Sequence, residues 1–335
     1  MTLTGRKVIF RAPGRAELEP ITVDEKNLGP TEVVVRTEVT LISPGTELAN
    51  LHDRLGVNSE APPRAYPVRN VGYANVGTVV AAGAELPFAP GQRVYTMGNH
   101  ASYVRLDARE RVCAPVPDGL AAEQAVFVRL ATVSMTTMRT TAARGGDAVA
   151  VVGLGLVGNL AAQVFQACGM RVNAFDLAPA RRAIAERCGL RSVHDGAQAS
   201  AFARQHRLVV EASGSARALA SAVGLAQDGG EVVMVGAPWG GDENSVPSSR
   251  LTRDIFFRFL KLRSGSEWEI PRQPQPLVPD SILANTQTGL AWLADGRLRV
   301  EPLITHQLPP EQIQSAYDGL RDRADDFLGV VLQWR

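Results

Sequence analysis

Cysteine, charge of one sign and long apolar runs are all scarce in this sequence of 335 residues. The three cysteines, Cys113, Cys168 and Cys188, stand far apart, which excludes a disulfide framework and the close spacing of a zinc site. No stretch is apolar for long enough to span a bilayer, and the N-terminal "MTLTGRKVIF" lacks the apolar core of a signal peptide. We therefore expect a cytoplasmic protein that does not bind a membrane.

The charge balance argues against a nucleic-acid partner as well. Lys and Arg total 35 against 34 Asp and Glu, so the net charge is +1, and no block of one sign stands out. Hydrophobic residues make up 45% of the chain and glycines number 31. This composition and length are typical of a globular α/β protein with two domains.

The first part of the chain, residues 1–125, is predicted to be β-rich. The runs "KVIF", "EVVVRTEVTLI", "GTVVAA" and "QRVYTM" are rich in β-branched residues and are bounded by Gly and Pro. In "LISPGTEL", residues 41–48, a Pro-Gly pair predicts a turn directly before Thr46 and Glu47.

The pattern changes near residue 120. "AAEQAVFVRLATVSMTTMRTTAA" has helical spacing, and helical segments then alternate with continuous apolar runs at 148–152, 171–175, 208–212 and 231–236. Such runs suit a parallel sheet covered on both faces, so residues 126–269 are predicted to form a doubly wound Rossmann domain. Residues 270–335 begin with the proline-rich "PRQPQPLVP" and are expected to return to the first domain, adding a helix over 280–295 and a final strand "GVVLQW".

A glycine motif gives the first sign of function. Gly153, Gly155 and Gly158 form G-x-G-x-x-G directly after a predicted buried strand and at the start of a predicted helix. The first glycine permits a tight turn, the second lets the backbone approach a pyrophosphate, and the third allows close helix–strand packing. The helix N-terminus, which includes Leu156 and Val157, then offers free N–H groups to the phosphates.

A carboxylate ends the next predicted strand. Asp176 lies 18 residues after Gly158, where it can accept hydrogen bonds from the adenosine ribose hydroxyls. It would repel a 2′-phosphate, so NAD(H) is favoured over NADP(H), although Arg181 and Arg182 follow within reach. Two later strand ends, "EASGS" and "VGAPWG", add Ser213, Gly236 and Ala237 as candidate cofactor contacts, with ordinary turn chemistry an equal alternative.

With these motifs the chain resembles the medium-chain dehydrogenase/reductase family over nearly its whole length. The landmarks are "SPGTE", "GYANVGTVVAAG", "PGQRV", "GLGLVG" and "SGSE". The resemblance implies a GroES-like catalytic domain formed by 1–125 and 270–335, a Rossmann domain, a small-molecule substrate and a homodimer. It also implies that Thr132 and Ser266 lie near the cofactor, with helix packing an equal alternative for Thr132.

The zinc ligands of that family are replaced here. Pro44 stands where the metal thiolate would be, Tyr73 stands where an imidazole ligand would be, and Val128 or Arg129 falls at the third ligand position. Catalytic zinc needs three N, S or O ligands, so the sequence predicts a member without zinc. The Pro-Gly-Thr-Glu turn resembles that of a subgroup that includes a bacteriochlorophyllide hydroxyethyl dehydrogenase and relatives in secondary-metabolite pathways.

Without a metal, hydride transfer still needs a proton donor or acceptor. The resemblance gives Thr46 the role of proton-relay hydroxyl, while Glu47 and Tyr73 are candidates for proton transfer. Each has a structural alternative: an ion pair of Glu47 with Arg129, and an apolar filling role for Tyr73. The loop histidines His52 and His100 are held in reserve.

We therefore expect an NAD(H)-dependent enzyme that interconverts a secondary alcohol and a ketone, in secondary or specialised metabolism. One alternative is reduction of an activated C=C bond or a quinone, although relatives with that activity usually prefer NADPH, against which Asp176 argues. The other is a non-catalytic NAD(H)-binding sensor, since a degenerate site would also have lost its zinc ligands.

Overall fold

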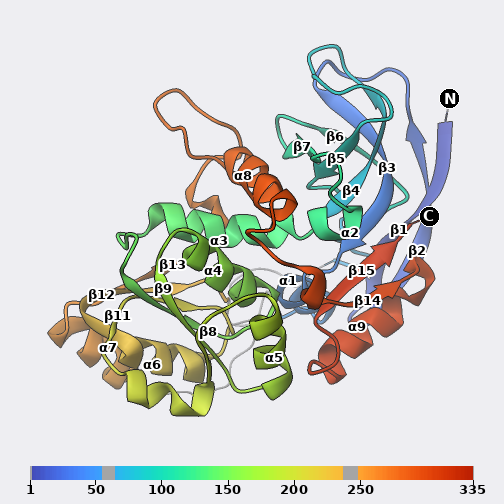
Figure 1. The fold of residues 1–335 in the computed structure, drawn as a ribbon. Helices are drawn as coiled ribbons and strands as arrows, with labels where there is room; N and C mark the ends of the chain where they lie inside the picture. Colours follow the sequence, from blue (N-terminus) through green and yellow to red (C-terminus); the bar gives the residue numbers. More distant parts are fainter. Residues whose placement is uncertain (1, 55–64, 237–247, 335) are drawn as a thin grey trace. The chain divides into compact units, whose positions relative to one another are not determined.

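The computed structural model describes residues 2–54, 65–236 and 248–334, and the chain divides into two units (Figure 1). Unit 1 contains Met1–Arg129, Pro271–Asp295 and Ile304–Arg335, and unit 2 contains Leu130–Ile270 and Gly296–Leu303. The sequence-based boundaries had given residues 296–303 to the first domain.

Unit 1 is built on two sheets, and all their strand pairs are antiparallel except β14 with β15, which is parallel. One is the hairpin of β1 (Thr2–Ala12) and β2 (Arg15–Asp24). The other has the order β14-β15-β3-β4-β5-β7, with β6 also paired to β3. Its strands are β3 (Glu32–Leu41), β4 (Asn75–Ala82), β5 (Arg93–Thr96), β6 (Tyr103–Asp107), β7 (Cys113–Pro115), β14 (Ile304–Leu308) and β15 (Gly329–Gln333).

The C-terminal segment completes the core of unit 1. Helix α9 (Ile313–Asp322) packs Tyr317 against Phe10 of β1, with ring centroids 5.4 Å apart, and both side chains are fully buried. Leu51 at the end of α1 (Pro44–Leu51) belongs to the same apolar cluster. The first strand, the first helix and the last helix therefore share one core, which fixes the segment that carries Thr46 and Glu47.

The "SPGTEL" segment is the first turn of α1, so the predicted turn is wrong. Ser43 is the N-cap and Pro44 occupies the first helical position, where its missing N–H costs nothing and its fixed φ suits a helix. The Pro-Gly pair is compatible with either structure, and the helix forms because its Ala49 and Leu51 are buried. The remaining helices of unit 1 are α2 (Ala122–Ala125) and α8 (Ile282–Ala294).

Unit 2 has the predicted doubly wound fold. Its six strands are parallel in the order β10-β9-β8-β11-β12-β13, and Figure 1 shows helices packed along them. The strands are β8 (Ala148–Val152), β9 (Arg171–Asp176), β10 (Val193–Asp195), β11 (His206–Glu211), β12 (Ala226–Met234) and β13 (Lys261–Ser264). The order reverses between β8 and β11, which is where a doubly wound sheet binds its ligand.

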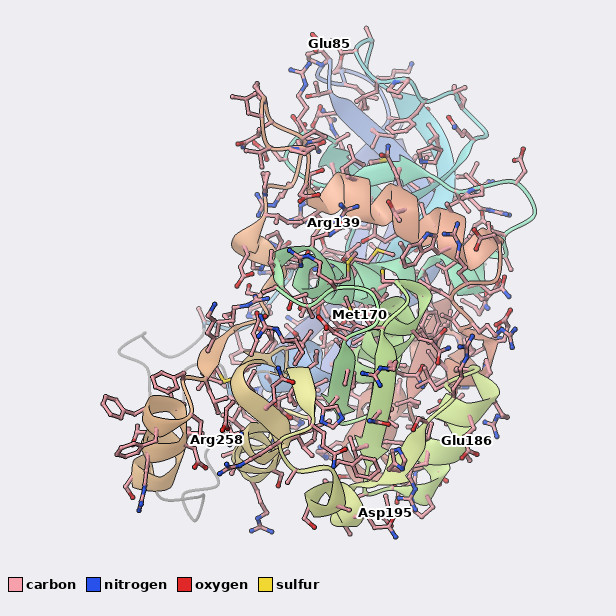
Figure 2. The ribbon with its side chains drawn as sticks, turned by 60° about the vertical axis from the view of Figure 1, so that its left-hand side comes forward. Glu85, Arg139, Met170, Glu186, Asp195 and Arg258 are labelled. Carbon is pink, nitrogen blue, oxygen red and sulfur yellow. The ribbon has the colours of Figure 1, made fainter. Side chains whose placement is uncertain are left out.

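The helices of unit 2 are α4 (Leu156–Ala167), α5 (Pro179–Arg187), α6 (Ala216–Leu225) and α7 (Ser248–Phe257). Helix α3 (Val128–Thr140) begins at the end of unit 1, and a break after α2 divides what the sequence predicted as one helix. Arg258 (labelled in Figure 2) follows α7 and is buried, and it donates to the carbonyl oxygens of Val223 and Ala226. No helix in the described part of the chain is long and apolar enough to cross a membrane.

Candidate active site and cofactor site

The glycine motif of unit 2 has the geometry of a dinucleotide loop. Gly153 has φ +90°, and a Cβ there would lie 2.9 Å from Ser213. A Cβ on Gly158 would lie 1.8 Å from the Gly153 carbonyl oxygen, so only glycine fits. Nothing lies within 4 Å of a Cβ placed on Gly155, which leaves open space beside the N-terminus of α4, where Leu156 and Val157 form the first turn. A pyrophosphate fits this cradle of free N–H groups.

Asp176, at the end of β9, is almost buried with 8% exposure. Its Oδ2 accepts a hydrogen bond from the Leu154 N–H at 2.6 Å, and its Oδ1 accepts one from the Ala178 N–H at 2.8 Å. Asp176 thus joins the glycine loop to the turn after β9, and each oxygen keeps a second lone pair for a ribose hydroxyl.

The two arginines near Asp176 differ in their contacts. Arg181 Nη1 lies 3.9 Å from Asp176 Oδ2. Arg182 donates to the carbonyl oxygens of Asp176 and Leu177 at 2.9 and 2.8 Å and pairs with Asp195 at 3.4 Å. Arg182 therefore supports the turn itself, whereas Arg181 is the cation beside the carboxylate.

Sequence reasoning missed Glu211, the last residue of β11 and a neighbour of the glycine loop. Its buried carboxylate accepts hydrogen bonds from the Ser213 N–H at 2.7 Å, from the Ser213 hydroxyl and from the Gly214 N–H at 3.2 Å. Burial raises the pKa of this carboxyl group. Glu211 therefore shapes the turn that packs against Gly153. In the sequence, its position at the end of a predicted strand, directly before "ASGS", could have pointed to this role.

The other predicted cofactor contacts are also in unit 2. A Cβ on Gly236 would lie 2.3 Å from Gly214 N, so this glycine packs against the same turn as Glu211. The Thr132 hydroxyl lies 3.4 Å from Glu267 Oε2, and the Ser266 hydroxyl caps the short 3₁₀ helix Glu267–Glu269. Ala237 lies outside the described residues.

Three hydroxyl groups meet in unit 1 at the start of α1. The Tyr73 hydroxyl donates to Ser43 Oγ at 2.6 Å, and the neighbouring Thr46 side chain lowers the pKa of the Tyr73 phenol. Thr46 is partly exposed, while Ser43 is buried. The structure places Thr46 and Tyr73 near one another and adds Ser43, which sequence reasoning missed.

Glu47 lies directly beneath this hydroxyl cluster, with an exposed fraction of 2%. Its Oε1 accepts a hydrogen bond from the Ser43 N–H at 2.7 Å. Its Oε2 lies 2.9 Å from His100 Nε2 and accepts a hydrogen bond from the Tyr317 hydroxyl at 2.6 Å. The carboxylate is fully engaged within the protein, so its geometry fits a supporting role better than a group that meets substrate.

The environment of Tyr73 keeps its phenol protonated. Burial is the main cause that raises the pKa of Tyr73, and the Glu47 charge adds to it, while Arg129 and the two neighbouring hydroxyls lower it. The Arg129 guanidinium carbon lies 4.6 Å from the centroid of the Tyr73 ring, in cation–π contact. Tyr73 is therefore a hydrogen-bond donor at neutral pH rather than a base.

The residues at the family's zinc position do not fit zinc. Within the described ranges, no three His, Cys, Asp or Glu side chains are grouped so that they could hold a metal ion. Pro44 and Val128 carry no ligand atom, and the Tyr73 hydroxyl is already bonded to Ser43. Of the reserve histidines, His100 is buried against Glu47, and His52 ends α1.

Part of unit 2 is similar to a known protein family. Residues 157–262 match the family model described as zinc-binding dehydrogenase. The match lies within unit 2 and begins at Val157 in the first turn of α4, so the chain is similar to that family over this part of its length.

Individual relatives are distant. The chain is 28% identical over 322 residues to the 2-desacetyl-2-hydroxyethyl bacteriochlorophyllide A dehydrogenase of Rhodobacter capsulatus, with 92% of this chain and 91% of that protein covered. Galactitol-1-phosphate dehydrogenase from Escherichia coli has a similar structure, with a TM-score of 0.79, 19% identity and coverage of 98% and 99%.

Two further similar structures contain a nicotinamide cofactor. One is an alcohol dehydrogenase from E. coli CFT073 complexed with NADH, with a TM-score of 0.78, 17% identity and coverage of 98% and 99%. The other, from Sinorhizobium meliloti, is bound to NADP, with a TM-score of 0.78, 19% identity and coverage of 99% of both chains. At these identities the likeness establishes the fold.

Proposed function

We propose that this protein is an NAD(H)-dependent oxidoreductase that interconverts a secondary alcohol and a ketone without zinc. The observation that supports the proposal is the hydroxyl cluster of Ser43, Thr46 and Tyr73, which includes a residue that the resemblance assigns to a zinc-ligand position. The name of the Rhodobacter relative, a hydroxyethyl-compound dehydrogenase, supports an alcohol as the reacting group.

Each unit has a separate task in this proposal. Unit 2 binds the dinucleotide through the glycine loop and Asp176, and the dinucleotide, when bound, supplies or accepts the hydride. In unit 1, Thr46 hydrogen-bonds to the substrate oxygen. During ketone reduction the oxygen takes a proton from the Thr46 hydroxyl, which is partly exposed and regains one from water. In alcohol oxidation Thr46 passes the alcohol proton to water. The Tyr73 phenol stays protonated throughout and, with Ser43, positions the Thr46 hydroxyl.

Replacing Thr46 by Val tests the relay. We expect kcat for ketone reduction with NADH to fall by about 10²- to 10⁴-fold, the usual contribution of a positioned proton donor. The dissociation constant for NADH, measured by fluorescence titration, should not change, because the glycine loop lies in unit 2. Unchanged turnover would remove Thr46 from the mechanism.

Two controls belong to that experiment. Thr305→Val removes another hydroxyl of unit 1, from β14, and should leave turnover near the wild-type value. Elemental analysis of the same preparations should find zinc well below one equivalent, and stoichiometric zinc would overturn the metal-free mechanism. If NADH binds but no alcohol or ketone in a broad panel reacts, the sensor alternative gains support; enone reduction alone would favour the C=C alternative.

Cofactor choice tests Asp176 separately. We expect kcat/KM with NADH to exceed that with NADPH by about tenfold or more, because a carboxylate repels the 2′-phosphate. Asp176→Ser should bring this ratio closer to one, mainly by lowering kcat/KM with NADH. Arg181→Ala should lower only the residual activity with NADPH. Equal use of both cofactors by the wild type would show that Asp176 does not select between them.

A further inference from the structure

A histidine that the proposed chemistry does not use lies under the hydroxyl cluster. The His100 side chain is completely buried, and its Nε2 is 2.9 Å from Glu47 Oε2. Its Nδ1 is also buried and has no hydrogen-bond partner within the described part of the chain. A proton on Nδ1 would therefore be unpaired, so the hydrogen-bond pattern assigns the proton to Nε2, which donates to Glu47.

The first connection from His100 to Tyr73 passes through Glu47. Oε2 of Glu47 meets His100, and Oε1 accepts the Ser43 N–H at 2.7 Å. Ser43 carries the oxygen that accepts the Tyr73 hydroxyl at 2.6 Å. Fixing the carboxylate therefore fixes the acceptor of the phenol.

The second connection passes through the backbone before Tyr73. Gly72 has φ +82°, and a Cβ on it would lie 2.5 Å from the His100 ring. The backbone N–H of His100 donates to the Val71 carbonyl oxygen at 2.8 Å, and the Asn99 side chain donates to the Gly72 carbonyl oxygen at 3.2 Å. The segment that carries Tyr73 therefore packs directly against the His100 ring and is hydrogen-bonded to the backbone of His100.

We propose that His100 is a positioning residue of this enzyme, because it holds the Glu47 carboxylate and the Gly72 backbone together and so fixes the position of the Tyr73 hydroxyl. The proposal rests on the proposed role of the hydroxyl cluster in catalysis. His100 itself touches neither substrate nor cofactor; its effect reaches the reacting oxygen through Tyr73 and Ser43.

Three substitutions of His100 distinguish the loss of its hydrogen-bond donor from a change in side-chain volume. His100→Leu keeps an apolar volume and removes the donor, and kcat should fall by about 10- to 100-fold because the phenol is no longer held in place. His100→Gln keeps an amide N–H with similar reach and should recover most of the loss. His100→Asn carries the same amide on a shorter side chain and should not. NADH affinity should be unchanged in all three variants.

The outcomes decide the proposal. Wild-type kcat in His100→Leu, or equal recovery by Gln and Asn, would overturn it. His306→Leu is the matched control, because His306 lies on β14 and stacks on Phe327 with ring centroids 3.6 Å apart. It should lower the unfolding temperature without lowering kcat, which separates a loss of stability from a loss of positioning.

A second readout does not depend on turnover. In protein labelled with [Cζ-¹³C]tyrosine, the chain gives five tyrosine signals, and Tyr73→Phe identifies that of Tyr73. The Tyr73 signal should shift in His100→Leu and return toward its wild-type position in His100→Gln. If it does not move, the positioning role is wrong whatever the substrate is. If it moves as expected but no alcohol or ketone reacts, the proposed function fails and the structural coupling stands.

Discussion

Replacing Gly158 by Ala is expected to abolish NADH binding and to destabilise unit 2 by about 3 kcal/mol, the upper end of the usual cost of overpacking. The new Cβ would lie 1.8 Å from the Gly153 carbonyl oxygen and 3.1 Å from the Ala212 side chain. The first contact is with backbone that cannot rotate away, so either α4 moves off the sheet or the glycine loop opens. Chemical unfolding and NADH fluorescence titration measure the two effects.

Two other glycines make the comparison specific. Gly155→Ala should leave the unfolding midpoint unchanged, because nothing lies within 4 Å of the new Cβ. It should nevertheless weaken NADH binding by about tenfold or more, because the methyl group would occupy the space expected for the pyrophosphate. Gly224→Ala on α6 also meets nothing within 4 Å and should stabilise unit 2 by about 0.4–1 kcal/mol without affecting NADH. Normal NADH binding by Gly158→Ala would contradict the role of the motif in binding.

The fold of unit 2 could be predicted because its signals are local. Each apolar run of the parallel sheet is continuous, and the glycine motif stands directly between a strand and a helix. The same motif predicts where a cofactor would bind, since the strand order places Gly153, Asp176 and Ser213 at the carboxyl ends of strands, the edge where doubly wound sheets bind ligands. The start of α1 was harder, since Pro44 and Gly45 are as common in turns as at helix starts.

The support of the hydroxyl cluster could not be predicted, because its partners are distant in the sequence. His100 is 53 residues from Glu47, and Tyr317 is 270 residues away. No spacing rule joins residues across such distances; only the packing of α9 and of the segment around His100 against α1 brings them together. The resemblance proposed Thr46 and Glu47 as candidates, and the three-dimensional structure shows that Glu47 is buried and hydrogen-bonded within unit 1.

Glu47→Leu should be strongly destabilising, costing about 3 kcal/mol or more. It leaves three donors without an acceptor: the Ser43 N–H, the His100 Nε2–H and the Tyr317 hydroxyl. Each buried donor without a partner costs about 1–3 kcal/mol. Glu47→Gln should cost less, since its amide oxygen still accepts from two of the three. Glu85→Leu is the control, because Glu85 (labelled in Figure 2) is half exposed and its pair with Arg109 contributes at most about 1 kcal/mol.

A double-mutant cycle with Tyr317→Phe tests whether unpaired donors are the cause. In the wild type, Tyr317→Phe removes a 2.6 Å hydrogen bond to Glu47 and should be destabilising. In the Glu47→Leu background the same change removes an unpaired hydroxyl, so it should be neutral or stabilising. The two effects should therefore differ by about 1–3 kcal/mol in urea unfolding. Additive losses would mean that Glu47 contributes through its volume, and the hydrogen-bonded support of the site would have to be abandoned.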